Sequence, residues 1–215
     1  MSNNPFLHEE IYRGEDLYEK LRAKNLLICG CGALGSNLAL NLVRHGFSQM
    51  TVLDMDRVEK HNISTQVWYE TDLGLTKVKA LADQAYDISF AEFEEKYVEL
   101  TEKNIRKSLR DIDLVVDCFD NNAARKLLTE YCAEKKIDCL HGGLNADFGE
   151  VCWNQKYKVP ADVEDGDVCD YPLARNIAGL VVIVMTEEIL SYMLDDEPRR
   201  KNWNITLRDL QIREK

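Results

Sequence analysis

Short apolar segments alternate with segments of helical periodicity through the first two thirds of the chain. The segments at residues 26–29, 50–53, 96–100, 114–116 and 137–140 are typical of buried strands, and those at 34–45, 77–85, 101–109 and 123–135 are typical of helices. Continuous apolar strands separated by helices predict a mainly parallel sheet covered on both faces. We therefore expect a doubly wound α/β fold.

The last third of the chain has a different pattern. Residues 149–153 and 203–212 are predicted as strands and residues 173–194 as a helix, which gives the C-terminal part a mixed character. We expect residues 156–171 to form a mobile acidic loop, because they carry no periodicity and are rich in aspartate and glutamate. We expect residues 1–24 to form an N-terminal helical arm of a single domain, since 215 residues fit one domain.

The charge balance disfavours some partners. The formal net charge is -11, so phosphate backbones and anionic lipid surfaces are repelled, and we expect neither nucleic acid nor membrane as a partner. The longest apolar run, residues 177–185, is about half as long as a bilayer span requires. The N-terminus shows no secretory signal, and the seven cysteines are typical of reduced thiols, so a cytoplasmic location is expected.

A glycine motif follows the first predicted strand and opens the first predicted helix. Its glycines, Gly30, Gly32 and Gly35, allow a tight turn in which backbone N–H groups approach a phosphate. Asp54 ends the second predicted strand, where it could accept hydrogen bonds from a ribose. This half of the fold is thus expected to be Rossmann-like and to bind a nucleotide through residues 30–35, including Ala33 and Leu34. A turn that serves only helix packing is the alternative.

Further motifs narrow the class of protein. They are the segment 53–62, Gln66, the segment 72–77, the segment 117–121 with Arg125, and the pair Gly142 and Gly143 followed by Gly149. In their order from about residue 26 to 193, they resemble the ThiF/MoeB/HesA family of ubiquitin-activating-enzyme-like adenylyltransferases. The resemblance implies ATP-dependent, Mg²⁺-dependent adenylation of the C-terminal glycine of a ubiquitin-like or sulfur-carrier protein, with release of pyrophosphate.

The resemblance also implies roles for individual residues. Asp54 matches the ribose-binding aspartate, Lys77 the lysine at the leaving pyrophosphate, Asp120 the aspartate that holds Mg²⁺, and Asn62 a residue that lines the phosphates. Asp56, Gln66 and Asn121 are further candidates for the nucleotide site. Two of these residues also have structural alternatives: Lys77 could be a solvated surface lysine, and Asp120 could only cap the following helix.

Cys169 is a candidate nucleophile, since the family often places a cysteine there that accepts the activated carrier; a buried or inert cysteine is the alternative. For Arg125 a structural ion pair is favoured over contact with ATP. No Cys-x-x-Cys pair is present, so no structural zinc is expected. The resemblance implies a symmetric dimer and the helix 173–194 is apolar almost all round, so a homodimer is expected; a core helix in a monomer is the alternative.

Two arginines of the family pattern are missing. Thr65 occupies the position of one, three residues beyond Asn62, and residues 8–10 have no counterpart of an N-terminal arginine that reaches the partner's ATP. Arg13 or Arg22 could substitute for these cations. Otherwise the chain could be a weakened or inactive scaffold that binds a partner. An NAD-dependent oxidoreductase is less favoured, because it leaves Lys77 and Asp120 without a role.

Overall fold

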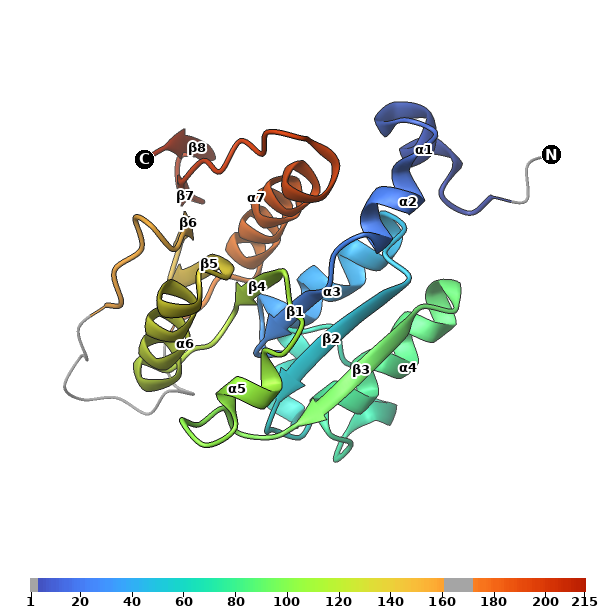
Figure 1. Ribbon diagram of the computed structural model, residues 1–215. Helices are drawn as coiled ribbons and strands as arrows, with labels where there is room; N and C mark the ends of the chain where they lie inside the picture. The colour runs from blue at the N-terminus through green and yellow to red at the C-terminus, as the bar shows by residue number, and fades with distance from the viewer. Residues whose placement is uncertain (1–3, 161–171) are drawn as a thin grey trace.

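The computed structural model describes residues 4–160 and 172–215 and contains one eight-stranded sheet (Figure 1). The strand order is β3-β2-β1-β4-β5-β6-β7-β8. The strands are β1 (Leu26–Cys29), β2 (Gln49–Asp54), β3 (Glu92–Tyr97), β4 (Leu114–Asp117), β5 (Asp138–Asn145), β6 (Phe148–Trp153), β7 (Trp203–Thr206) and β8 (Gln211–Glu214).

The sheet has a parallel part and an antiparallel part. The five strands from β3 to β5 run parallel, and β6, β7 and β8 continue the sheet antiparallel. Strands β2 and β3 follow β1 on one side of it, and β4 then pairs with the other side of β1. In open α/β sheets, ligands bind beyond the carboxyl ends of the strands at this kind of switch point. The predicted doubly wound fold is confirmed.

Helices cover both faces of the sheet (Figure 1). One face carries α3 (Gly35–Arg44), α4 (Lys77–Ser89) and α7 (Arg175–Leu194), with α2 (Leu17–Arg22) packed against α7 and α1 (Leu7–Arg13) before it. The other face carries α5 (Ile105–Ser108) and α6 (Asn122–Lys135). Two 3₁₀ helices, η1 (Lys60–Ser64) and η2 (Glu70–Asp72), lie in the connection between β2 and α4.

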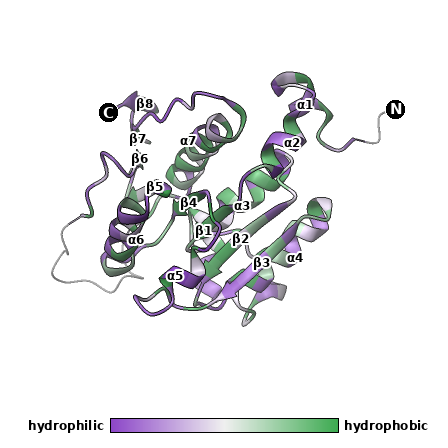
Figure 2. Cartoon of the chain, viewed as in Figure 1, coloured by the Kyte–Doolittle hydropathy of each residue, from purple (hydrophilic) through white to green (hydrophobic). Residues whose placement is uncertain are grey.

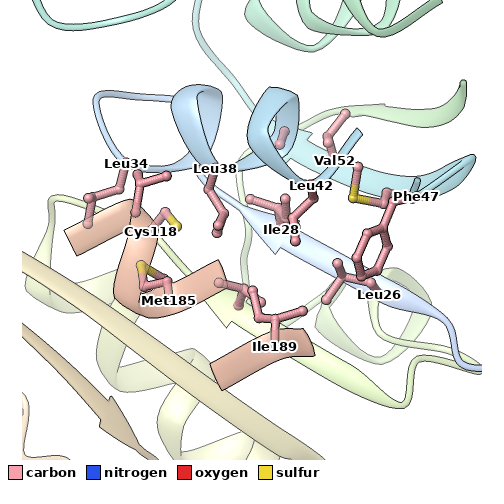
Figure 3. Packing of buried hydrophobic residues seen from close by; sticks show 14 of the residues in the cluster. Leu26, Ile28, Leu34, Leu38, Leu42, Phe47, Val52, Cys118, Met185 and Ile189 are labelled. Carbon is pink, nitrogen blue, oxygen red and sulfur yellow. The ribbon is translucent and has the colours of Figure 1, made fainter. Parts of the chain in front are cut away.

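The two faces of β1 supply two separate apolar cores. Leu26 and Ile28 point into the larger core, where α3 and α7 meet the sheet (Figure 3). Leu27 and Cys29 point into the smaller core beneath α5 and α6. Because the central strands are buried on both faces, their sequences are continuously apolar rather than alternating. This continuous apolar pattern made the strands predictable from the sequence.

Helix α7 is a core element. It is a 20-residue, largely apolar helix (Figure 2) that by length and composition could cross a membrane. However, 72% of its most apolar window is buried inside the protein. It packs on β6, where Gly149 leaves no room for a side chain: a Cβ built there would lie 2.2 Å from Cγ2 of Val181. Burial against the sheet and α3 thus accounts for most of its apolar surface.

Most predicted elements are confirmed with shifted ends; β5 ends at Asn145 rather than at 140, and α4 ends at Ser89 rather than at 85. Three further elements differ from the prediction. Strand β3 spans 92–97 rather than 96–100, because it is a charged edge strand whose side chains are largely exposed and carry little apolar signal (Figure 2). Helix α5 is shorter than the predicted 101–109, since Asn104 holds a turn by accepting from the Thr101 N–H. The predicted strand 203–212 is a hairpin of β7 and β8, in which Leu210 has a positive φ of 48°.

Gly149 and Gly179 give a matched test of the packing of α7. Gly149→Ala forces a methyl group into Val181 and should lower the free energy of unfolding by about 1–3 kcal/mol. Gly179→Ala, on the exposed side of α7 with no atom within 4 Å of its Cβ, should raise it by about 0.5–1 kcal/mol. Urea denaturation followed by circular dichroism measures both, and equal effects would contradict this packing.

Candidate functional site

The glycine loop links β1 to α3 and packs directly on the end of β4. Gly30 has φ +90°, and a Cβ there would lie 2.9 Å from the carbonyl oxygen of Cys118. A Cβ at Gly35 would lie 1.8 Å from the oxygen of Gly30, so no larger residue fits this turn. The loop, with Gly32, Ala33 and Leu34 between these glycines, therefore brings the first turn of α3 to the switch point between β1 and β4.

Asp54 fastens the glycine loop to the end of β2. Its Oδ2 accepts from the Cys31 N–H at 2.6 Å, and its Oδ1 accepts from the Asp56 N–H at 2.7 Å. Burial raises the pKa of Asp54, while the positive charge of Lys77 and these hydrogen bonds act in the opposite direction. The residue predicted to bind ribose is thus at the crevice and also holds two backbone segments in place.

Lys77 is not a solvated lysine. It is the first residue of α4, is only 6% exposed, and its Nζ lies 2.9 Å from Oδ2 of Asp56. Burial lowers its pKa, but the charges of Asp54, Asp56 and Asp120 outweigh this, so that the pKa of Lys77 is raised and it stays charged. The structure therefore brings the buried cation of α4 into one electrostatic cluster with three carboxylates, which come from the end of β2, the loop that follows it and the turn after β4.

Asp120 lies in the turn between β4 and α6 and is exposed. It does not cap α6: that role belongs to Asn121, whose side-chain oxygen accepts from the Ala124 N–H at 2.8 Å. No group of three metal-ligating side chains occurs among the residues that the structure describes. Asp120 fits Mg²⁺ in the mode in which one carboxylate acts together with substrate phosphates.

The two polar candidates in and after η1 make structural contacts. Asn62 is buried, and its side-chain oxygen accepts from the Glu59 N–H at 2.9 Å. Gln66 accepts from the indole N–H of Trp68 at 2.6 Å. Both shape the loop between β2 and α4, and their roles toward a nucleotide stay predictions.

A buried polar network lies beneath the Asp120 turn. Asp117, at the end of β4, accepts from the Phe119 N–H and lies 2.8 Å from Nδ1 of His141 and 3.6 Å from Nη1 of Arg125. Arg125 also donates to the carbonyl of Gly142 and to the hydroxyl of Tyr157. The predicted structural ion pair of Arg125 is thereby confirmed, and this network fixes the turn that carries Asp120.

Sequence reasoning did not find the roles of His141 and Tyr157. Their rings stack at 3.8 Å between centroids, and Nε2 of His141 lies 2.8 Å from the side-chain oxygen of Asn154. His141 lies within β5 and directly follows the apolar segment 137–140 that was recognised in the sequence, but nothing in the sequence paired it with Tyr157. Tyr157 belongs to the start of the predicted acidic loop, residues 156–171, so its contacts anchor that end of the loop. Residues 161–171, which include Cys169, lie outside the described residues.

The arginines proposed as substitutes are engaged elsewhere. Arg13, on α1, lies 2.7 Å from Glu9 and 2.7 Å from Glu187. Arg22 donates to the hydroxyl of Ser48, which precedes β2 at the amino end of the strands, opposite the crevice. Neither guanidinium lies at the glycine loop of its own chain.

Four of the buried cysteines lie in environments that disfavour the nucleophilic thiolate. Burial raises the pKa of the Cys29, Cys31, Cys118 and Cys139 thiols above the usual value. Cys31 contributes through its backbone N–H, which binds Asp54, rather than through its thiol. The absence of structural zinc stays a prediction.

Comparison with known proteins assigns this arrangement to a family. The family model described as "ThiF family" matches residues 7–213. The chain belongs to the ThiF family. The adenylyltransferase and sulfurtransferase MOCS3 of Anopheles gambiae is 29% identical over 190 residues, which cover 83% of this chain and 43% of that protein. The ubiquitin-like modifier-activating enzyme 5 of Drosophila simulans is 28% identical over 149 residues, which cover 62% of this chain and 37% of that protein.

Solved structures share the fold of this ThiF-family chain. E. coli MccB in complex with MccA-N7isoASN has a TM-score of 0.83 at 18% identity and covers all of this chain, which in turn covers 72% of MccB. PaaA has a TM-score of 0.76 at 18% identity. The chain spans under half the length of these two curated relatives.

The network around Asp117 predicts a pH-dependent stability. Burial favours the neutral acid, but the charge of Arg125 and the hydrogen bond to His141 outweigh it and lower the pKa of Asp117 below its usual 3.8. The ionised carboxylate therefore stabilises the fold above pH 3.8, and this contribution is lost as the pH falls through the lowered value.

Arg125→Met should thus lower the free energy of unfolding by about 3–5 kcal/mol at pH 7, because it leaves Asp117 buried and without its cation. The deficit should shrink toward pH 4, where Asp117 becomes protonated in the variant. Lys126→Met, an exposed neighbour on α6, is the control and should change stability little. A deficit of constant size between pH 8 and pH 4, measured by denaturant titration, would contradict the assignment.

Proposed function

We propose that this chain is an ATP-dependent adenylyltransferase that activates the C-terminal glycine carboxylate of a ubiquitin-like or sulfur-carrier protein. The observation that carries the proposal is the buried, charged Lys77 beside Asp54 and Asp56 and within the field of Asp120. A buried lysine that only balanced charge would need one carboxylate. Three carboxylates around one lysine, next to an anion-binding loop, suit a site completed by a metal-bound polyphosphate.

The proposed reaction assigns a role to each of these residues. A carboxylate oxygen of the carrier attacks the α-phosphorus of ATP, an acyl-adenylate bond forms, and the bond to the β-phosphate oxygen breaks with release of pyrophosphate. The glycine loop and the first turn of α3 bind phosphate oxygens through backbone N–H groups. Lys77 stabilises the negative charge that develops on pyrophosphate, and Asp54 orients the ribose. Mg²⁺ held by Asp120 would supply further neutralisation of the phosphates.

The relatives support this class of activity. One is named an adenylyltransferase and sulfurtransferase, another a ubiquitin-like modifier-activating enzyme. MccB, whose fold is similar, has been solved with ATP, with a TM-score of 0.79 at 17% identity to this chain. A cytoplasmic location remains part of the proposal, and Cys169 would act only in a later transfer step.

A scaffold that binds a partner without catalysis is the second candidate. Thr65 favours the scaffold, because it replaces an arginine of the family pattern. The contacts that hold Arg13 and Arg22 away from the glycine loop favour it as well. The two candidates differ in one measurable property: only the adenylyltransferase must bind Mg-ATP through Lys77.

Calorimetry with Mg-ATP provides this test. Lys77→Ala should weaken binding about 10- to 100-fold, the cost of one or two charge-assisted hydrogen bonds. Lys79→Ala, an exposed lysine on the same helix, is the matched control and should leave binding unchanged. Asp120→Asn should remove most of the dependence of ATP affinity on Mg²⁺. Wild-type protein without affinity for Mg-ATP, or equal affinity in the Lys77 and Lys79 variants, would favour the scaffold.

The proposed active form is a homodimer. The exposed side of α7 carries Ile183, which is 56% exposed, together with Gly179 and Leu180, and the neighbouring hairpin turn adds Leu210, which is 74% exposed. Apolar side chains on one helix face can pack against the same face of a second copy around a two-fold axis.

Light scattering should give twice the 24.7 kDa mass of one chain. Ile183→Asp should shift the mass to that of the monomer without loss of helical circular dichroism, because the charge would be buried in the interface. Phe90→Asp, at the exposed C-cap of α4, is the control and should leave the dimer intact. A wild-type monomer at micromolar concentration would refute the dimer.

A further inference from the structure

The site has too few cations for a triphosphate. Asp54, Asp56 and Asp120 contribute three negative charges, and Lys77 is already hydrogen-bonded to Asp56. The whole chain carries a net charge of -11, so no general positive field compensates. Phosphoryl chemistry depends on cations that neutralise the charge of the leaving group.

One arginine lies where a cation is missing. Arg175 is the first residue of α7, and its Nη1 donates to the carbonyl of Ser64 at 2.9 Å. This places the guanidinium beside Thr65, although the two residues are 110 positions apart in the sequence. The side chain is exposed, and no ion pair joins it to a carboxylate within residues 4–160 and 172–215.

Arg175 shares a cavity with Asn37, which is hydrogen-bonded to the glycine loop. Arg175 and Thr65 line one end of a cavity of about 400 Å³ together with Asn37, which belongs to the first turn of α3. The rest of the lining includes Leu180, Ile183 and Leu210, the apolar side chains of the proposed dimer face. The side-chain amide of Asn37 donates to the carbonyl of Ala33 at 2.8 Å and to that of Thr65 at 2.9 Å. The cavity wall is therefore tied directly to the loop expected to bind phosphate.

We propose that Arg175 binds the phosphates of ATP and supplies, from α7, the guanidinium that position 65 lacks. This rests on the proposed function. A guanidinium has five N–H donors, and the bond to Ser64 uses one of them, so four remain for a bidentate contact with phosphate oxygens. The carbonyl of Ser64 orients the side chain before ATP arrives, without the competition of a carboxylate partner.

Calorimetry with Mg-ATP and with AMP tests the proposal. Arg175→Ala should weaken binding of Mg-ATP about 10- to 100-fold, and binding of AMP less than about threefold, because AMP lacks the outer phosphates. Arg175→Lys should fall between alanine and wild type, since lysine keeps the charge but not the bidentate geometry. Arg44→Ala, an exposed arginine at the other end of α3, is the control and should behave as wild type.

A relocated arginine gives the sharpest test. In the double variant Thr65→Arg with Arg175→Ala, the new side chain enters the same cavity from the residue after η1, and Mg-ATP affinity should return to within about threefold of wild type. Circular dichroism and light scattering confirm that fold and mass are unchanged. Wild-type protein that fails to bind Mg-ATP overturns the proposed function together with this inference. Wild-type binding that Arg175→Ala leaves unchanged, or weakened binding that the relocated arginine does not restore, overturns only the role of Arg175.

Discussion

The contact between the glycine loop and the end of β4 is the constraint on which the rest of the site depends. Gly30 and Gly35 pack so closely against Cys118 and each other that any side chain would force the loop away from the sheet. The same contact sets where α3 begins and therefore where its N–H groups point. Because Asp54 binds the Cys31 N–H, the end of β2 is fixed to the loop as well. Three strand ends thus share one rigid crevice.

Two groups of charged residues border this crevice and serve different purposes. Asp117 and Arg125 are buried, neutralise each other and bond to backbone, so they hold the Asp120 turn rather than face a substrate. Lys77 and Asp56 are also paired, but Asp54 and Asp120 add negative charge that the described residues around Lys77 do not balance. Such an imbalance suits a site that is completed by an incoming cation with its polyphosphate. The inferred role of Arg175 fits the same view, because it places one more cation at the crevice.

The antiparallel extension and α7 determine how the crevice is enclosed. Gly149 on β6 lets α7 lie close to the sheet, which buries most of the helix and directs Arg175 at its start toward η1. The opposite side of α7 remains apolar and exposed at Ile183. One helix therefore closes the core, carries a candidate phosphate ligand and offers a face for a second copy. Changes along α7 are expected to couple stability, nucleotide affinity and oligomeric state.

The sequence by itself determined the parallel core, the glycine loop and the candidate Asp54, because local periodicity and motif spacing are properties of neighbouring residues. Lys77 and Asp120 became candidates through the resemblance of their motifs to the ThiF family. It misplaced β3, whose glutamates follow the needs of an exposed edge rather than a core. It could not pair His141 with Tyr157 or Ser64 with Arg175, since such contacts join distant segments and arise only when the strands stack in order. Tertiary structure alone decided that Lys77 is buried and charged, because its pKa depends on carboxylates brought together by the fold.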